Sequence, residues 1–307
     1  MSGEKFPVTY RISHQTVFSY DNPIGETVQE LRMQPRTEGA QTCLDFQLKI
    51  SPPAQVFRYQ DYLGNIVHHF DIPGQHQEFR VLAQAMVKVE PLIQPDAGQS
   101  KESAWSHLDR LRDQCEHWDF LTPSPATMPT AALDEFCREI GLDRKGDPLS
   151  TLMWLSQQLY ERLEYTPQGT DVDTPMDRVL ATRKGVGQDF AHILMMIARR
   201  LGIPCRYVSG YLYQGKRAPG RWIPTNMHAW VEALLPGHGW IGVDPTNNSR
   251  TGVGHIRTAI GRDYWDVPAN RGVHKGFAQC QLEVKVNVQP VKARPKVAAR
   301  QAIASIP

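Results

Sequence analysis

The sequence has few cysteines, and none of them is placed as a metal site or a disulfide framework requires. Five cysteines occur among 307 residues, widely scattered and without a Cys-x-x-Cys pair. This pattern argues against a disulfide-stabilised scaffold and against a cysteine zinc site. We therefore expect reduced thiols at all five positions, which are Cys43, Cys115, Cys137, Cys205 and Cys280.

Long hydrophobic runs and a large net charge are also missing. No apolar stretch approaches the roughly 18 residues that a membrane helix needs, and residues 1–10 lack the apolar core of a signal peptide. Lys and Arg number 34 against 32 Asp and Glu, which gives a net charge of +2. So small a charge provides no long-range attraction to nucleic acid or to a membrane. We expect a cytoplasmic protein with neither as a partner.

Signatures of cofactor and metal binding are absent as well. Residues 185–187 read Gly-Val-Gly without the third glycine of a dinucleotide fingerprint, and no Walker-type Gly-Lys-Ser/Thr occurs. The eleven histidines show no spacing typical of metal ligands. The sequence therefore predicts no cofactor and no metal.

The chain length and the first strand-like runs predict a β domain at the N-terminus. A chain of 307 residues is about twice the usual domain size, so we expect two folding units. Apolar and polar residues alternate over residues 8–20, which is the period of a half-buried strand. Further strand-like runs, bounded by Gly and Pro turns, cover residues 44–50, 55–59, 66–72 and 79–89. Residues 1–90 are predicted to form an antiparallel β-sandwich, in which Pro73-Gly74 separates the last two strands.

Helical periods dominate the first part of the second unit, residues 91–290. Apolar stripes predict helices within residues 108–115, 133–140, 147–163, 174–180 and 187–201. Strand-like runs then cover residues 206–213, 227–235, 240–243 and 280–288. Helices followed by an antiparallel sheet indicate an α+β fold. Residues 291–307 carry four basic residues and no acid, and we expect them to be a flexible tail.

A histidine and an aspartate on a predicted hairpin could carry chemistry. His228 and Asp244 lie on its two arms, with residues 236–239 as the turn. Counting outward from the turn puts them within about one diagonal position, where side chains touch. We therefore expect an imidazole nitrogen of His228 within about 3.2 Å of an Asp244 oxygen. Such a pair is the base and orienting group of a nucleophilic triad, although it also occurs as a purely structural hydrogen bond.

Several segments together resemble the bacterial transglutaminase-like family of the papain-type superfamily. Those of the expected site are Gly-Val-Gly-Gln-Asp-Phe at residues 185–190, His-Ala-Trp-Val-Glu at 228–232 and Gly-Val-Asp-Pro-Thr at 242–246. Those that resemble the family's N-terminal β domain are residues 10–14, 30–36 and 61–65, and residues 202–211 and 261–264 resemble stretches that flank its core. The resemblance implies an N-terminal β domain followed by a papain-like transglutaminase core.

The resemblance also implies a Cys-His-Asp triad for amide chemistry. In that chemistry a thiolate attacks an amide carbonyl, ammonia or an amine leaves, and water or a second amine resolves the acyl-enzyme. His228 and Asp244 match the second and third members. Where the family pattern reads Gly-Val-Cys-Gln-Asp-Phe, however, this chain has Gly187 in place of the cysteine. Glycine has no atom to attack with, and losing the nucleophile of a triad can lower turnover by a factor on the order of 10⁶.

Four of the five cysteines are considered as a replacement for the missing nucleophile, and none of the four is expected to take its place. Cys205 follows the far end of the helix that starts at Gly187, about 21 Å away at 1.5 Å per residue. Cys115 and Cys137 lie on apolar helix faces and Cys280 on the apolar side of a strand, so all three are predicted to lie in the core.

We therefore expect a transglutaminase-like protein that binds a peptide or protein amide without catalysis, or that acts as a partner subunit. One alternative is an altered form of an active cysteine-dependent amidase, protease or acyltransferase. Another is a His228–Asp244 pair that activates water or works with a different nucleophile. Gln188 and Trp230 are the candidate substrate-binding residues, with core packing as the alternative for Trp230, and His192 is expected to be a structural hydrogen-bonding partner. The resemblance further suggests amide-forming ATP-grasp-type enzymes as partners.

Overall fold

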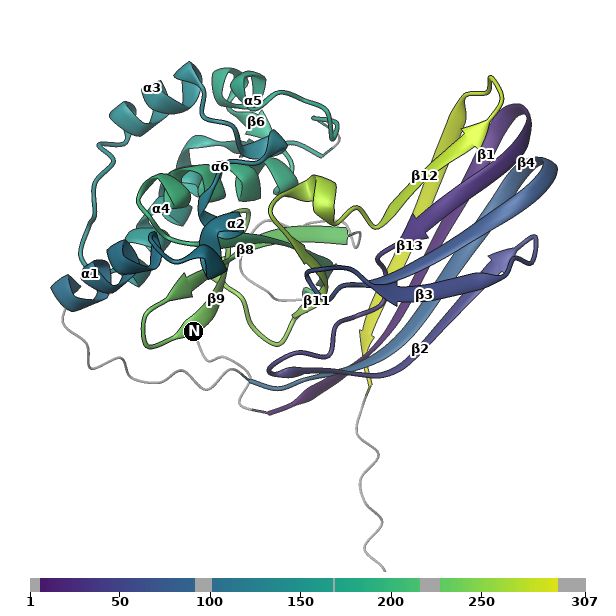
Figure 1. Cartoon of the computed structure of the whole chain (residues 1–307), viewed down its shortest axis with the longest axis horizontal. Coiled ribbons are helices and arrows are strands. Elements are labelled where there is room, and N and C mark those ends of the chain that lie inside the picture. Colours follow the sequence, from purple (N-terminus) through teal and green to yellow (C-terminus); the bar gives the residue numbers. More distant parts are fainter. Residues whose placement is uncertain (1–5, 92–100, 168, 216–226, 292–307) are drawn as a thin grey trace, which may run out of the picture.

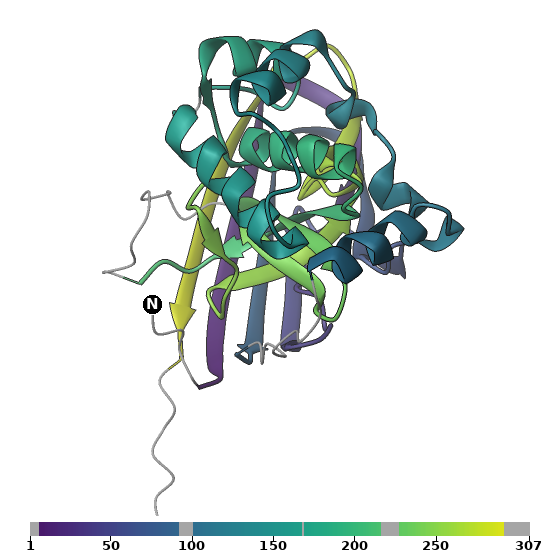
Figure 2. The same cartoon turned by 90° about the vertical axis from the view of Figure 1, so that its left-hand side faces the viewer.

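Two antiparallel sheets organise the molecule, one in a long β domain and one inside a helical core (Figure 1). The computed structural model describes residues 6–91, 101–167, 169–215 and 227–291. The helices lie together on one side, in front of the long strands when the molecule is turned by 90° (Figure 2). The α+β fold predicted from the sequence is confirmed.

The β domain is built on two very long strands. β1 (Val8–Leu31) and β4 (Ile66–Val89) have 24 residues each and pair antiparallel along most of their length. Four shorter strands extend the sheet beyond these two, with β13 and β12 pairing with successive parts of β1 and β2 and β3 pairing with β4. Their bounds are β2 (Gln41–Ser51), β3 (Val56–Gln60), β12 (Asn270–Lys275) and β13 (Cys280–Pro290).

The predicted antiparallel arrangement is present, but its strands form a single hydrogen-bonded sheet where a sandwich has two. Residues 66–72 and 79–89 belong to one strand, so the prediction of a break at Pro73-Gly74 was wrong. Gly74 has a φ of 82°, and the register between β1 and β4 shifts close to it. A β-bulge therefore absorbs this dipeptide without ending the strand.

Residues 280–288 were predicted for the core sheet, and the structure corrects this placement. β13 pairs with the first half of β1, from Tyr10 opposite Pro290 to Tyr20 opposite Cys280. Alternation along a sequence indicates a strand but not its partner, which explains the error. Cys280 is also exposed in this strand. Cys115 is exposed as well, because α1 ends at Leu111 and does not extend to it. Both had been predicted to lie in the core.

The core consists of helices that surround one buried helix, packed on a five-stranded sheet of order β10-β9-β8-β7-β11. The helices are α1 (Lys101–Leu111), α2 (Trp118–Leu121), α3 (Ala131–Glu139), α4 (Pro148–Arg162), α5 (Met176–Thr182) and α6 (Gly187–Arg200), with 3₁₀ turns at residues 115–117, 125–127 and 264–266. The sheet strands are β7 (Cys205–Leu212), β8 (Met227–Leu235), β9 (Gly239–Asp244), β10 (Ser249–Arg250) and β11 (His255–Gly261), and a short parallel pair joins β5 (Glu164–Tyr165) to β6 (Lys184–Gly185). None of the helices in the described ranges is long and apolar enough to cross a membrane.

The central helix α6 is held at both ends. Every residue from Asp189 to Arg199 is buried, so its apolar stripe packs into the core as predicted. At its C-terminal end the Arg199 guanidinium is buried and donates hydrogen bonds to the backbone carbonyls of Phe120 at 3.0 Å, Cys205 at 2.9 Å and Arg262 at 2.7 Å. These bonds fix the helix against the segments around its end, and hence fix where its first residue lies.

The β domain and the core share buried contacts. Asn65 follows the turn before β4 and exchanges two hydrogen bonds of 2.8 Å with the backbone of Ile260 in β11. His14 of β1 lies 3.0 Å, through Nδ1, from the hydroxyl oxygen of Tyr211 in β7. Apolar residues of both parts form one cluster there, which includes Tyr10, Ile12, Val87, Tyr211 and Ile256.

Two buried histidines make the stability of the fold depend on pH. His14 and His192 are 2% and 3% exposed, and burial lowers the pKa of each to about 4. The unfolded chain takes up a proton at each position near pH 6.5, whereas the folded chain does not until about pH 4. Unfolding is therefore favoured as pH falls through this window. We predict that each histidine lowers the free energy of unfolding by about 2 kcal/mol between pH 7 and pH 5.

Urea unfolding of His14→Gln at pH 7 and pH 5 tests this prediction. Glutamine can still hydrogen-bond the Tyr211 hydroxyl but does not titrate, so the loss of stability between the two pH values should shrink by about 2 kcal/mol. His107→Gln, at an exposed position of α1, is the matched control and should leave the pH dependence unchanged. The same pH dependence in His14→Gln as in the parent chain would contradict the prediction.

Candidate functional site

The hairpin of β8 and β9 brings His228 and Asp244 together. Val231 lies opposite Val243, so that His228 and Asp244 are diagonal neighbours. Nε2 of His228 lies 2.8 Å from Oδ2 of Asp244, and both side chains are buried. This confirms the hydrogen bond predicted from the spacing. Because a carboxylate only accepts, Nε2 donates, and Nδ1 of the neutral ring is left as the acceptor.

The Asp244 carboxylate is the most heavily bonded group of the site. It is fully buried and also accepts from Thr246 N at 3.0 Å, Asn247 N at 3.2 Å, Asn247 Nδ2 at 2.7 Å and His255 Nε2 at 3.2 Å. Burial alone would raise the pKa of Asp244, but its electrostatic interactions with the His228 and His255 rings and the hydrogen bonds from them outweigh burial and hold it well below its usual range. Asp244 is therefore an anion at neutral pH.

His255 is a member of the site that the sequence did not reveal. It begins β11, a strand that does not pair with β8 or β9, so hairpin spacing could not find it. Its Nδ1 accepts from the backbone N–H of Gly252 at 3.2 Å. Nε2 of the neutral ring therefore carries the proton, and it donates to the same Asp244 oxygen as His228 does. Asp244 thus lies between two imidazole donors.

His228, Asp244 and His255 are also residue types that bind metals, and one ligand atom of each lies within 4.8 Å of the others. Histidine spacing in the sequence had predicted no such cluster. A nitrogen binds a metal only without its proton. Nε2 of His255 keeps its proton while Nδ1 accepts from Gly252, so the present hydrogen bonds favour a His–Asp–His network over metal ligation.

Gly187 is the first residue of α6 and lies against His228. A Cβ atom built on Gly187 would lie 3.3 Å from Nδ1 of His228 and 3.5 Å from Oγ1 of Thr246. The acceptor nitrogen of the dyad therefore points at the position where the family pattern has its cysteine. The hydroxyl of Thr246 is buried and has no hydrogen-bond partner. The first backbone N–H groups of a helix have no intrahelical acceptor, so they are suited to bind a carbonyl oxygen or an oxyanion.

Two family models match the chain. Residues 10–88 match the bacterial transglutaminase-like N-terminal region, and residues 136–245 match the transglutaminase-like superfamily core. The chain belongs to the transglutaminase-like superfamily. The two matches fall within the predicted β domain and the predicted core.

Individual proteins are similar to nearly the whole chain or to a part of it. An uncharacterized protein of Mycobacterium leprae is 29% identical over 91% of this chain and 97% of its own length. A protein-glutamine gamma-glutamyltransferase of Pseudomonas aeruginosa is 35% identical, but only over 28% of this chain and 14% of that enzyme. The fold resembles that of a Cytophaga hutchinsonii protein proposed to be a cysteine protease, with a TM-score of 0.77, 21% identity and coverage of 94% and 92% of the two chains.

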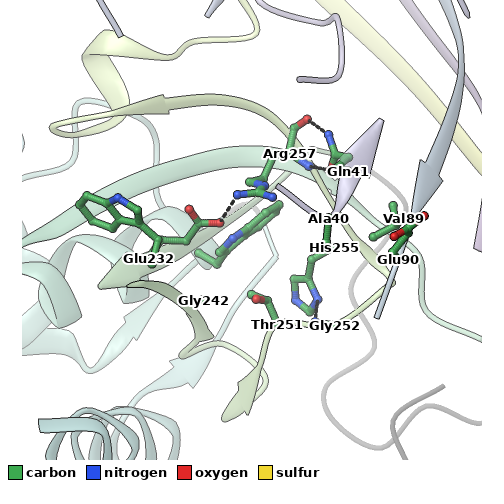
Figure 3. Close-up of a pocket in the computed structure, with 12 residues that line it drawn as sticks. Ala40, Gln41, Val89, Glu90, Glu232, Gly242, Thr251, Gly252, His255 and Arg257 are labelled. Carbon is green, nitrogen blue, oxygen red and sulfur yellow. Dashed lines mark hydrogen bonds and ion pairs between the residues drawn. The ribbon is translucent and has the colours of Figure 1, made fainter. Parts of the chain in front are cut away.

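Trp230, one of the two predicted substrate-binding residues, lies on the side of this transglutaminase-like core that faces the β domain. With Glu232, His255 and Arg257 it lines a pocket of about 50 Å³, which residues of β2 and β4 close from the other side (Figure 3). Figure 3 shows Arg257 bonded to both Glu232 and Gln41. Trp230 is 1% exposed and its ring centroid lies 5.2 Å from that of His255. Trp230 is therefore a buried residue that packs against the His228 and His255 rings.

Gln188, the other predicted substrate-binding residue, lines a separate pocket of about 290 Å³ beside the start of α6. Asp189 and His192 line the same pocket. Asp189 Oδ2 accepts from Val186 N at 2.8 Å and so caps the helix, while His192 Nε2 accepts from Tyr264 N at 3.1 Å. His192 is thus the structural hydrogen-bonding partner that the sequence predicted. This recess is distinct from the one that Trp230 lines, and the first turns of α6 border it.

We predict that Asp244→Asn lowers the free energy of unfolding by about 3–5 kcal/mol at pH 7, because the buried donors around position 244 lose their anionic acceptor. The pKa of Asp244 is lowered in the folded chain from an ordinary value of 3.8. The advantage of Asp244 is therefore complete above that value and is lost as pH falls below it. Urea unfolding at pH 7 and pH 3 should show the difference between the two chains narrowing by about 1 kcal/mol.

The matched control for this prediction is Asp143→Asn, an exposed carboxylate before α4. It should change the free energy of unfolding by less than about 0.5 kcal/mol. Equal stability of Asp244→Asn and the parent chain at pH 7 would show that the carboxylate charge is not required where the structure places it.

Proposed function

We propose that this transglutaminase-like chain binds a peptide or protein amide and neither cleaves nor transfers it. The proposal rests on one observation: the base of the triad is present, but the nucleophile is not. Nδ1 of His228 faces the first residue of α6, and that residue is Gly187. Without a nucleophile only binding and polarisation of the amide remain. A partner role beside an ATP-grasp-type amide-forming enzyme is a further prediction, which rests on the family resemblance alone.

The remaining groups complement both ends of an amide. Its carbonyl oxygen can accept from the first backbone N–H groups of α6, at the positive end of the helix dipole. Its N–H can donate to Nδ1 of His228. Asp244 accepts a hydrogen bond from Nε2–H of that ring, which keeps Nδ1 available as the acceptor. The His228–Asp244 pair then orients a bound amide where, in an enzyme, it would activate a thiol.

We predict that His228→Phe weakens binding of the probe acetyl-Gln-Gly-amide by about tenfold, because a buried amide N–H loses its acceptor. Calorimetric titration of the parent chain and the variant measures the difference. His107→Phe, at an exposed position of α1, is the control and should bind as the parent does. Equal affinity in His228→Phe, or ammonia release by the parent chain, would contradict non-catalytic binding at this site.

A second candidate is an altered form of an active cysteine-dependent enzyme, and the space at Gly187 favours it. The Cβ contact of 3.5 Å with Thr246 is an ordinary van der Waals contact, whereas that of 3.3 Å with Nδ1 of His228 is tight and requires the His228 ring to shift by a few tenths of an ångström. A cysteine side chain therefore needs only small adjustments of its neighbours. The scaffold that would lower the pKa of such a thiol, a helix N-terminus beside an imidazole, is already in place.

We predict that Gly187→Cys creates a thiol that iodoacetamide alkylates at pH 6 about a hundredfold faster than the native cysteines, because its pKa is depressed. At four native cysteines the background is lowered by burial, which raises the pKa of Cys205 to about 12 and also raises those of Cys137, Cys43 and Cys280. Mass spectrometry of the alkylated peptides gives each rate.

Gly187→Cys/His228→Ala is the control for this experiment and should lose most of the acceleration. Fast alkylation together with hydrolysis or amine transfer on glutamine peptides would favour the altered-enzyme candidate. Slow alkylation of Gly187→Cys would mean that the site no longer supports a thiolate, and the altered-enzyme candidate would be rejected.

A further inference from the structure

The pocket beside α6 has an apolar rim that is open to solvent. Three large side chains line it, from the segment before α3, the loop before α5 and the last 3₁₀ turn. They are Met128, Val172 and Trp265, which are 56%, 44% and 41% exposed. Apolar side chains gathered around the mouth of a pocket are suited to contact the aliphatic part of a ligand.

The residues that line the inner side of this pocket have two buried polar atoms without hydrogen-bond partners. Asp189 is 0% exposed and His192 is 3% exposed. Oδ1 of Asp189 and Nδ1 of His192 have no hydrogen-bond partner. The two residues are three apart on α6 and so share one face of the helix. A buried acceptor and a buried donor left unpaired are costly, and a ligand that pairs with both relieves that cost.

The charged groups that line the pocket are all acidic. Asp173 and Asp177 belong to the lining with Asp189, and no Lys or Arg does among the described residues. The imidazole of His192 does not offset these charges, because burial lowers its pKa to about 4. A cation is therefore favoured in the pocket, an anion is repelled, and an uncharged aliphatic group leaves the Asp189 oxygen unpaired.

We propose that this pocket holds the basic side chain, Lys or Arg, of a peptide whose amide occupies the site at Gly187. The proposal rests on the proposed function and adds the chemical class of the ligand. The cationic group pairs with Oδ1 of Asp189, and the rim contacts the methylene stem, with the Trp265 ring also attracting the charge. Nδ1 of His192 donates to a carbonyl of the same peptide, because its Nε2 already accepts from Tyr264.

The two sites are close enough for one short peptide. Gln188 and Asp189 directly follow Gly187, and His192 lies about 7.5 Å along the helix at 1.5 Å per residue. An extended peptide advances about 3.3 Å per residue. A basic residue two or three positions from the bound amide can therefore reach the pocket.

Calorimetry with matched peptides tests the proposal. The probes are acetyl-Gln-Gly-Lys-amide and acetyl-Gln-Gly-norleucine-amide, which differ in the ammonium group, together with a pair in which alanine replaces glutamine. We expect the parent chain to bind each lysine probe about tenfold more tightly than its norleucine counterpart, as a charge-assisted hydrogen bond provides. Asp189→Asn should abolish this preference.

Because Asp189 also caps α6, a second variant keeps the test informative if Asp189→Asn does not fold. Asp173→Asn/Asp177→Asn changes only exposed rim carboxylates and should reduce the preference for lysine several-fold. Glu135→Gln, an exposed carboxylate on α3 outside the pocket, is the matched control and should leave the preference unchanged.

The outcomes separate this proposal from the proposed function. Equal affinity of the lysine and norleucine probes overturns the basic-anchor proposal, and the proposed function still stands if His228→Phe weakens the binding of both glutamine probes. Conversely, lysine preference without any effect of glutamine or of His228→Phe supports the pocket and rejects amide binding at Gly187. Failure of all four probes to bind the parent chain overturns both.

Discussion

The buried Asp244 carboxylate is the interaction on which the rest of the site depends. A charge without solvent exposure costs several kcal/mol unless hydrogen bonds and opposite charge compensate for it. Asp244 is 0% exposed and accepts from five donors on β8, on the turn after β9 and on β11. Its burial therefore fixes the His228 ring, the Thr246–Asn247 turn and the His255 ring at once.

This dependence changes what an intact His–Asp pair implies. His228 supplies one of the donors that a buried Asp244 needs, whether or not a nucleophile is present at position 187. The absence of a thiol at Gly187 would not change the requirement of the buried Asp244 carboxylate for hydrogen-bond donors. Retention of the pair follows from stability alone and does not by itself indicate catalysis. The start of α6 is also independent of the side chain at 187, because Arg199 and Asp189 hold the two ends of the helix.

The parts of the site that could be predicted from the sequence depend on local periodicity. The apolar stripe of α6 and the diagonal from His228 to Asp244 each follow from the geometry of one helix or one hairpin. His255 could not be found in this way, because β11 meets β7 at the opposite edge of the sheet and reaches Asp244 only through the fold. The exposure of Cys280 was missed for a similar reason, since β13 leaves the core and pairs with β1. Where the strand partner is distant in sequence, alternation predicts a strand but not its surroundings.

A glycine at the nucleophile position is better suited to holding an amide than to reacting with one. An enzyme gains rate only from interactions that strengthen in the transition state, and tight binding of the ground state does not help it. A binding protein has the opposite requirement. Gly187 has a hydrogen where a cysteine would have its CH2–SH group. No side-chain atom of residue 187 would therefore contact the carbonyl carbon, and a planar amide could approach both the first N–H groups of α6 and Nδ1 of His228. If the chain binds amides as proposed, a glycine at position 187 favours retention of an intact amide, and the acidic pocket one turn along the helix would decide which amide is retained.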